Sequence, residues 1–179
     1  QIRALAEAGV DLIVIETMTD IYEIQEAIKA AKDVGMGLAP IPGRPQGSSL
    51  PIVASVTFTR DDRTLLGDSP AKVARRIADA GADVIGVNCS GGPSQLLRIL
   101  KQMRQAVPNR SAKFWVKPNA GWPEQVGGRI MYPADAEYFG DYALSFREAG
   151  ANIVGGCCGT TPQHIAAMKK ALESAHQIS

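Results

Sequence analysis

The chain has 179 residues, of which 45% are hydrophobic, and its 19 Lys and Arg nearly balance its 18 Asp and Glu. This length and composition suffice for one buried core and exclude intrinsic disorder. The near-zero net charge excludes a surface that holds nucleic acid by counterion release, and no stretch approaches the ~20 apolar residues that cross a bilayer. With no basic and apolar leader at its start, the sequence predicts a cytoplasmic protein without nucleic-acid or membrane partners.

One short junction recurs along the chain, an Ala-Gly pair followed by an apolar run. Glycine just after a helix adopts the left-handed conformation that ends it, and the apolar run is typical of a buried parallel strand. The first ten residues therefore indicate the tail of a helix that leads into a strand. The strands predicted in this way lie at residues 12–16, 52–58, 84–88, 113–117 and 152–155.

Capping residues mark the starts of the intervening helices. The predicted helices run from Thr19 and Asp20 toward Val34, over 73–80 after Ser69-Pro70, from 92–94 to Val107, and over 164–172 after Thr161-Pro162. Strands and helices that alternate throughout a chain predict an α/β fold with a parallel sheet, either doubly wound or a (β/α)8 barrel. Five units do not close an eight-stranded barrel. Segments 38–50 and 121–132 are predicted loops, and the second is a candidate lid.

All three cysteines follow predicted strands and have glycines nearby: Cys89 in the first cluster, Cys157 and Cys158 in the second. Because chemistry in parallel α/β folds takes place at the carboxyl ends of the strands, this position favours a functional site. Adjacent residues of a regular strand point to opposite faces, so the backbone must turn between Cys157 and Cys158. The glycines at 155, 156 and 159 permit such a turn. The alternative is that the cysteines are small buried hydrophobic residues.

Three thiolates are one short of a closed tetrahedral zinc site, and an open position is typical of catalytic zinc. A substrate thiol that enters this position is deprotonated by coordination and becomes a nucleophile toward an activated methyl group. No general base in the protein is then required, which agrees with the lack of an obvious acid–base pair. His164 and His176 are therefore not expected to be catalytic.

Three stretches carry a resemblance to a known family: 86–89 (Gly-Val-Asn-Cys), 118–121 (Pro-Asn-Ala-Gly) and 155–162 (Gly-Gly-Cys-Cys-Gly-Thr-Thr-Pro). They resemble the homocysteine S-methyltransferase family of zinc barrels. Residues 129–139 look most like bacterial two-domain proteins that join this module to a methylenetetrahydrofolate reductase. The homocysteine-binding module of cobalamin-dependent methionine synthase is also similar. The resemblance implies a (β/α)8 TIM-barrel type of fold, with only about the last five β-α units present.

The resemblance also implies roles for particular residues. Cys89, Cys157 and Cys158 match the zinc ligands, and Asn119 matches an asparagine that approaches the metal when substrate is absent. Glu16 matches an acidic residue near the amino-acid substrate, and its alternative role is that of a capping or solvated carboxylate. Asn88 and Asn119 are candidate substrate contacts, or turn residues that hold loops through their side chains. No catalytic residue is expected beyond the metal ligands.

By this resemblance, residues 1–179 form a single homocysteine-binding barrel domain that is incomplete at its N-terminus. The expected partners are homocysteine and a methyl donor, which is methyltetrahydrofolate, methylcobalamin, betaine or S-methylmethionine. A barrel without three of its strands exposes two sheet edges, so a missing N-terminal segment or self-association is expected to complete it. The chain alone is then expected to have little activity.

Two other functions compete with zinc-dependent methyl transfer to homocysteine. Lys117 lies at a predicted strand end, where a lysine can form a Schiff base with a carbonyl substrate, and the aromatic residues at 114 and 115 would desolvate it. A Schiff-base lyase would leave the three cysteines without a role. The remaining alternative is a zinc-binding barrel fragment that catalyses nothing.

Overall fold

The computed structural model describes residues 1–36, 50–108 and 112–176. Most of the predicted loop at 38–50 lies outside these residues. The elements in chain order are α1 (Ile2–Glu7), β1 (Ile13–Met18), α2 (Ile21–Met36), β2 (Ile52–Val56), α3 (Pro70–Ala80), β3 (Val84–Cys89), α4 (Pro93–Ala106), β4 (Lys113–Pro118), β5 (Glu124–Val126), β6 (Arg129–Met131), α5 (Ala136–Glu148), β7 (Ile153–Val154) and α6 (Pro162–His176).

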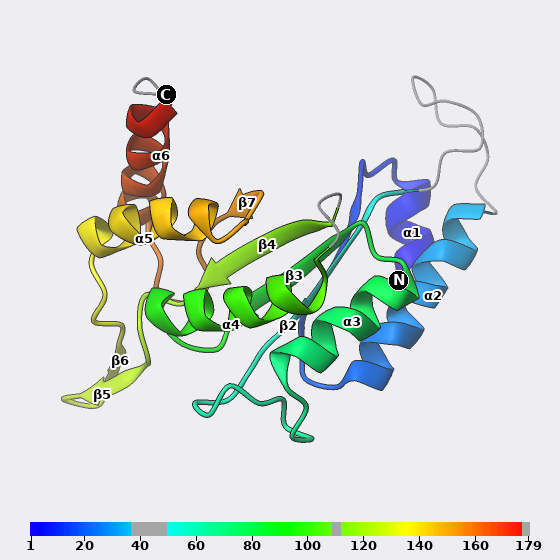
Figure 1. Cartoon of the computed structure of the whole chain (residues 1–179), viewed down its shortest axis with the longest axis horizontal. Helices are drawn as coiled ribbons and strands as arrows, with labels where there is room; N and C mark the ends of the chain where they lie inside the picture. The colour runs from blue at the N-terminus through cyan, green and yellow to red at the C-terminus, as the bar shows by residue number, and fades with distance from the viewer. Residues whose placement is uncertain (37–49, 109–111, 177–179) are drawn as a thin grey trace.

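The main sheet has five strands in the order β1-β2-β3-β4-β7, and every neighbouring pair is parallel. Each strand therefore lies beside the next one in the chain, apart from the inserted β5–β6 hairpin. Figure 1 shows α2, α3 and α4 side by side along this sheet in chain order, with α5 and α6 packed together beyond β7. This is the arrangement of consecutive β-α units in a barrel wall.

The predicted helix ends are confirmed at the glycines that close them. Gly9, Gly81 and Gly150 have φ of +85°, +79° and +95°, in the left-handed region that glycine tolerates best. The helix starts agree as well, because Ser69 accepts a hydrogen bond from the Lys72 N–H and Asp20 Oδ1 accepts one from the Tyr22 N–H at 2.6 Å. Local sequence chemistry thus sets the boundaries of the β-α units.

The hydrophobic core lies between the sheet and the helices. Ile13, Ile52, Ile85 and Phe114 lie on four neighbouring strands, each at most 3% exposed, and belong to one core cluster with the helices. The opposite face of the sheet is open toward both edges, where Val14 on β1 is 45% exposed and Ile153 on β7 is 46% exposed. This open face corresponds to the inner face of a barrel wall.

The segment predicted as a plain loop at 121–132 contains structure of its own. Its middle forms the antiparallel hairpin of β5 and β6, joined through Gly127 and Gly128, which both have positive φ. Two adjacent glycines with positive φ suit a tight hairpin turn. The sequence showed these glycines, but strands of three exposed residues carry no hydrophobic alternation that would reveal them.

Among the described residues, no helix combines the length and apolar character needed to cross a membrane.

Candidate metal centre

The three cysteine sulfurs meet at the carboxyl end of the sheet. Cys89 is the last residue of β3, and Cys157 and Cys158 lie in the turn that follows β7. Cys89 Sγ is 3.0 Å from Cys157 Sγ and 3.8 Å from Cys158 Sγ. All three sulfurs lie within 4.8 Å of one another, and none is in a disulfide. Residues almost 70 positions apart are therefore brought to one point, with β4 between their strands.

Unusual backbone conformations direct these side chains. Cys89 and Ser90 have φ of +52° and +56°, a region that residues with a side chain adopt at a cost of about 1–3 kcal/mol each. Consecutive left-handed residues turn the chain sharply as β3 ends. Such strain persists only where surrounding structure imposes it, and it is commonest at functional sites.

The turn that carries Cys157 and Cys158 depends on its glycines in different ways. Gly159 alone among the three has a positive φ, +75°. At Gly156 a Cβ atom would lie 2.6 Å from the Thr160 side chain, so this position requires glycine for space. The turn is closed by the Thr160 N–H, which donates to the Cys157 carbonyl at 3.2 Å. Of the three glycines expected to permit the turn, Gly159 supplies the left-handed residue and Gly156 supplies the space.

The geometry of the sulfurs fits a zinc ion. Zn–S bonds of about 2.3 Å in a tetrahedron place sulfurs about 3.8 Å apart. The distance from Cys89 to Cys158 is 3.8 Å, and the 3.0 Å from Cys89 to Cys157 needs only a small side-chain adjustment. Three soft sulfur donors with no carboxylate among them favour zinc over magnesium or calcium.

The thiols differ in acidity although they are neighbours. Burial, followed by the hydrogen bond and negative charge of Cys157, raises the pKa of Cys89 far above the usual value of a thiol. For Cys157 burial acts in the same direction, but hydrogen bonds from the Cys89 thiol, the Cys158 backbone and Asn88 outweigh it and lower the pKa. Cys157 therefore ionises more readily than Cys89 when no metal is bound.

Asn88 connects the three strands that lie beside the cysteine sulfurs. It is completely buried, and its Oδ1 accepts hydrogen bonds from the Thr17 N–H at 2.9 Å and from the Ser55 hydroxyl at 2.6 Å. Its Nδ2 donates to Thr17 Oγ1 at 2.7 Å and lies 4.0 Å from Cys157 Sγ. One amide thereby links β1, β2 and β3 at the level of the thiols.

Asn119 performs a similar task on the other side of the cluster. It is 6% exposed, its Oδ1 accepts the Cys158 N–H at 3.0 Å, and its Nδ2 donates to the Ser90 carbonyl at 3.4 Å. These contacts match the interpretation of both asparagines as residues that hold loops. Their contact with substrate stays a prediction.

Glu16 and Lys117 form an ion pair on the open face, with Lys117 Nζ 2.8 Å from Glu16 Oε2. Lys117 Nζ also lies 4.9 Å from the centre of the Trp115 ring. Glu16 is thus neither a helix cap nor a freely solvated carboxylate. A Schiff base would require the Lys117 amine to leave this partner.

His164 is hydrogen-bonded to neighbouring segments through both of its ring nitrogens. It is 8% exposed, and its Nδ1 accepts the Thr161 N–H at 3.1 Å. The proton therefore sits on Nε2, which donates to the Ala134 carbonyl at 3.0 Å. Both ring nitrogens are occupied, so the side chain has no free atom for proton transfer.

Sequence reasoning missed Tyr132, Thr17 and Ser55. The ring of Tyr132 covers Gly159, and partial burial with the nearby Cys158 thiol raises the pKa of its hydroxyl. Ser55 is a buried hydroxyl in an otherwise apolar strand, and this interruption was a usable signal. Thr17 and Tyr132 had no comparable signal, because their positions depend on the register of distant segments.

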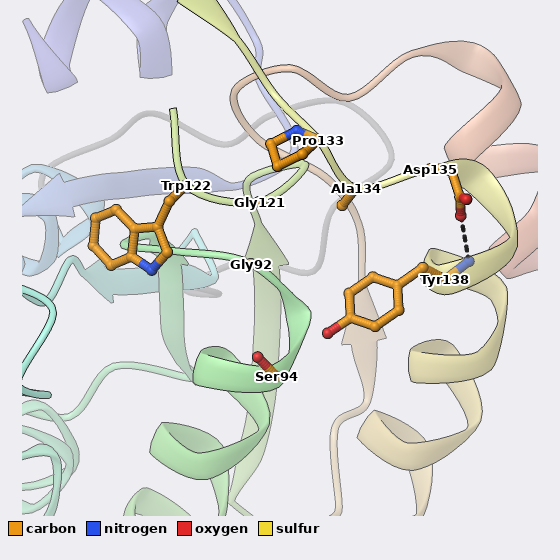
Figure 2. A pocket seen from close by; sticks show the side chains of 8 residues that line it. All are labelled: Gly92, Ser94, Gly121, Trp122, Pro133, Ala134, Asp135 and Tyr138. Carbon is orange, nitrogen blue, oxygen red and sulfur yellow. Dashed lines mark hydrogen bonds between the residues drawn. The ribbon is translucent and has the colours of Figure 1, made fainter. Parts of the chain in front are cut away.

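A pocket of about 420 Å³ opens between the N-termini of α4 and α5. Figure 2 shows Trp122 and Tyr138 on opposite sides of it and the Ser94 hydroxyl near its floor. Asp135 caps α5 by accepting the Tyr138 N–H at 2.9 Å. No cysteine lines this pocket, so it is separate from the thiol centre.

Comparison with known proteins identifies relatives along nearly the whole chain. A family model described as homocysteine S-methyltransferase matches residues 1–172. Methionine synthases from Mycobacterium tuberculosis (strain ATCC 25618 / H37Rv) and Mycobacterium leprae (strain TN) are 30% and 28% identical, each over 90% of this chain. The chain spans only 13% and 12% of their lengths.

Solved structures support the fold. The homocysteine methyltransferase MmuM from Escherichia coli, in its apo form, has a TM-score of 0.68 at 24% identity, over 95% of this chain and 53% of its own. A type I 3-dehydroquinate dehydratase from Clostridium difficile has a TM-score of 0.56 at 12% identity. At such identities the likeness concerns the fold alone, and it confirms the prediction of a partial TIM-barrel type of α/β fold.

Proposed function

Because the chain belongs to the homocysteine S-methyltransferase family, we propose that it is a methyltransferase module that binds zinc through Cys89, Cys157 and Cys158 and methylates homocysteine. The observation that carries the zinc proposal is the convergence of three free thiols from two strand ends, with no fourth His, Cys, Asp or Glu side chain within reach among the described residues. This ligand set leaves one position of a tetrahedron for a substrate.

The bound metal and the residues around it would have different roles in methyl transfer. When bound, zinc would lower the pKa of the homocysteine thiol enough for its proton to pass to solvent. Asn88 joins β3, which carries Cys89, to β1 and β2, and Asn119 holds the Cys158 backbone, so the sulfurs stay converged. Glu16 offers a carboxylate to the α-ammonium group of the substrate. In the transfer, a carbon–sulfur bond forms, and the bond between methyl group and donor breaks with its electron pair left on the donor.

Metal analysis tests the zinc proposal directly. We expect about one zinc per chain, and loss of most of it in Cys89→Ser and Cys158→Ser, because two sulfur ligands hold zinc far more weakly than three. Ser94→Ala is the matched control, since its exposed side chain lies five residues beyond Cys89 and outside the cluster. A fully reduced chain that retains no zinc would refute the proposal.

A proton balance tests the thiol chemistry. Homocysteine binding to the zinc-loaded chain should release a proton and become tighter as the pH rises toward the pKa of the free thiol. Calorimetry in buffers of different ionisation enthalpy measures this release. Binding without it would contradict activation of the thiol by the metal.

The methyl donor and catalytic competence are tested together. Turnover with homocysteine and each of methyltetrahydrofolate, methylcobalamin, betaine and S-methylmethionine would identify the donor. A chain that binds zinc and homocysteine but turns over none of them would instead be the non-catalytic fragment. Because the chain spans about an eighth of its curated relatives, donor contacts from other segments are part of this proposal.

We also propose that residues 1–179 belong to a single barrel domain that needs further strands or a second copy. Edge strands β1 and β7 carry Val14 and Ile153 with 45% and 46% of their surface exposed. Such edges tend to pair with other strands. Sedimentation analysis should show self-association of the isolated chain, and a stable monomer with intact secondary structure would refute the need for a partner.

A further inference from the structure

One charged pair on the open face of the sheet joins strands that are not neighbours. Glu16 on β1 and Lys117 on β4 are 101 positions apart in sequence, and β2 and β3 lie between their strands. The pair forms at 2.8 Å because the sheet curves and inner-face side chains converge. The Lys117 side chain is 23% exposed and that of Glu16 is 43% exposed, so both remain accessible from the open face.

The stem of Lys117 is fixed while its ammonium group is not buried. Its Nζ lies 4.9 Å from the centre of the Trp115 ring, two residues earlier on the same face of β4. On β7, a Cβ atom at Gly155 would lie 3.2 Å from Lys117 Cγ, so this glycine gives the stem its space. A lysine held along its methylene chain can change the partner of its charged end at little cost.

On both β1 and β4, the residue that follows the charged one lies level with the thiol centre or contacts its neighbour Asn88. Lys117 is in register with Asn88, and the next residue, Pro118, is in register with Cys89. On the other side, Glu16 directly precedes Thr17, whose backbone N–H is bonded to Asn88. A ligand whose sulfur reaches the cysteines through a short methylene chain therefore brings its other end to Glu16 and Lys117.

We propose that Lys117 binds the α-carboxylate of the amino-acid thiol, while Glu16 receives its α-ammonium group. This inference rests on the proposed function and assigns the residue that selects an amino-acid thiol over an aminothiol that lacks the carboxylate. The ion pair presents one negative and one positive group side by side, the complement of an amino-acid zwitterion. On binding, Lys117 exchanges the Glu16 carboxylate for the substrate carboxylate, and Glu16 exchanges the Lys117 ammonium for the substrate ammonium. No charge is then left unpaired.

The test compares homocysteine with its decarboxylated analogue, which keeps the thiol and the amine but lacks the carboxylate. Calorimetric titration of the zinc-loaded chain measures both affinities. Lys117→Met keeps the packed stem and removes the charge, and it should weaken homocysteine binding about 10- to 100-fold, the range of a lost charged hydrogen bond. Binding of the analogue should stay within about 2-fold. Lys117→Arg should restore part of the homocysteine affinity.

Two further variants separate this role from general effects. Lys113→Met removes a lysine from the opposite end of the same strand and should change neither affinity. Glu16→Gln should weaken both ligands, because both carry the amine. Equal weakening of the two ligands by Lys117→Met, or no weakening of homocysteine, would overturn the assignment of Lys117 while zinc binding and proton release still stand. A wild-type chain that binds zinc but neither thiol would overturn the proposed function, and the role of Lys117 with it.

Discussion

The asparagine behind the thiols provides the sharpest test of how this site is built. In Asn88→Ala the Ser55 hydroxyl, completely buried, loses the acceptor it contacts at 2.6 Å. An orphaned buried hydroxyl costs about 1–3 kcal/mol. The two hydrogen bonds to Thr17 are also lost, but Thr17 is exposed and water replaces them in part, which adds about 1 kcal/mol.

The expected loss in the free energy of unfolding is therefore about 3 kcal/mol, or a fall of about 6–12 °C in Tm for a chain of this size. Chemical denaturation of the metal-free protein measures the free energy, and a melting curve measures Tm. Zinc retention should fall as well, because Asn88 positions the strands that carry Cys89 and lies beside Cys157.

A double-mutant cycle decides whether the network is the cause. Ser55→Ala alone should cost about 1 kcal/mol, since Asn88 Oδ1 keeps the Thr17 N–H as a partner. In the double variant no hydroxyl is left orphaned, so its cost should be about 1–2 kcal/mol below the sum of the single variants. Additive costs would refute the reasoning, because they would mean that Asn88 contributes through packing and not through this hydrogen bond.

Two further predictions concern the turn that carries the paired cysteines. In the metal-free chain, Cys157 should be alkylated at lower pH than Cys89, because a lowered pKa yields thiolate earlier as the pH rises and a raised pKa delays it. Peptide mass mapping over a pH series measures the order in which the two cysteines are alkylated. The reverse order would contradict the assignment of the hydrogen bonds. Bound zinc should protect both residues from alkylation. Gly159→Ala should destabilise the protein by about 1–3 kcal/mol, because φ is +75° and the new Cβ would clash with the Tyr132 ring. Gly127→Ala, at a hairpin position with φ of +56° but open space around it, is the control that carries strain without a clash.

Much of the fold could be predicted because its signals are local. A glycine that ends a helix, a serine or aspartate that starts one, and a β-branched run between them each act within a few residues. The positions of β3 and α3 were therefore found to within a few residues. The hairpin of β5 and β6 was missed because its strands are short and exposed, and only Gly127 and Gly128 hinted at a turn.

The sequence by itself determined that three thiols follow strand ends and that the chain alternates strands with helices. Only the tertiary structure decided which side chains meet across strands. The convergence of Cys89 with Cys157, the burial of Asn88 and the pairing of Glu16 with Lys117 all follow from sheet register and curvature. These depend on how every strand packs against its neighbours, so no local pattern of residues encodes them.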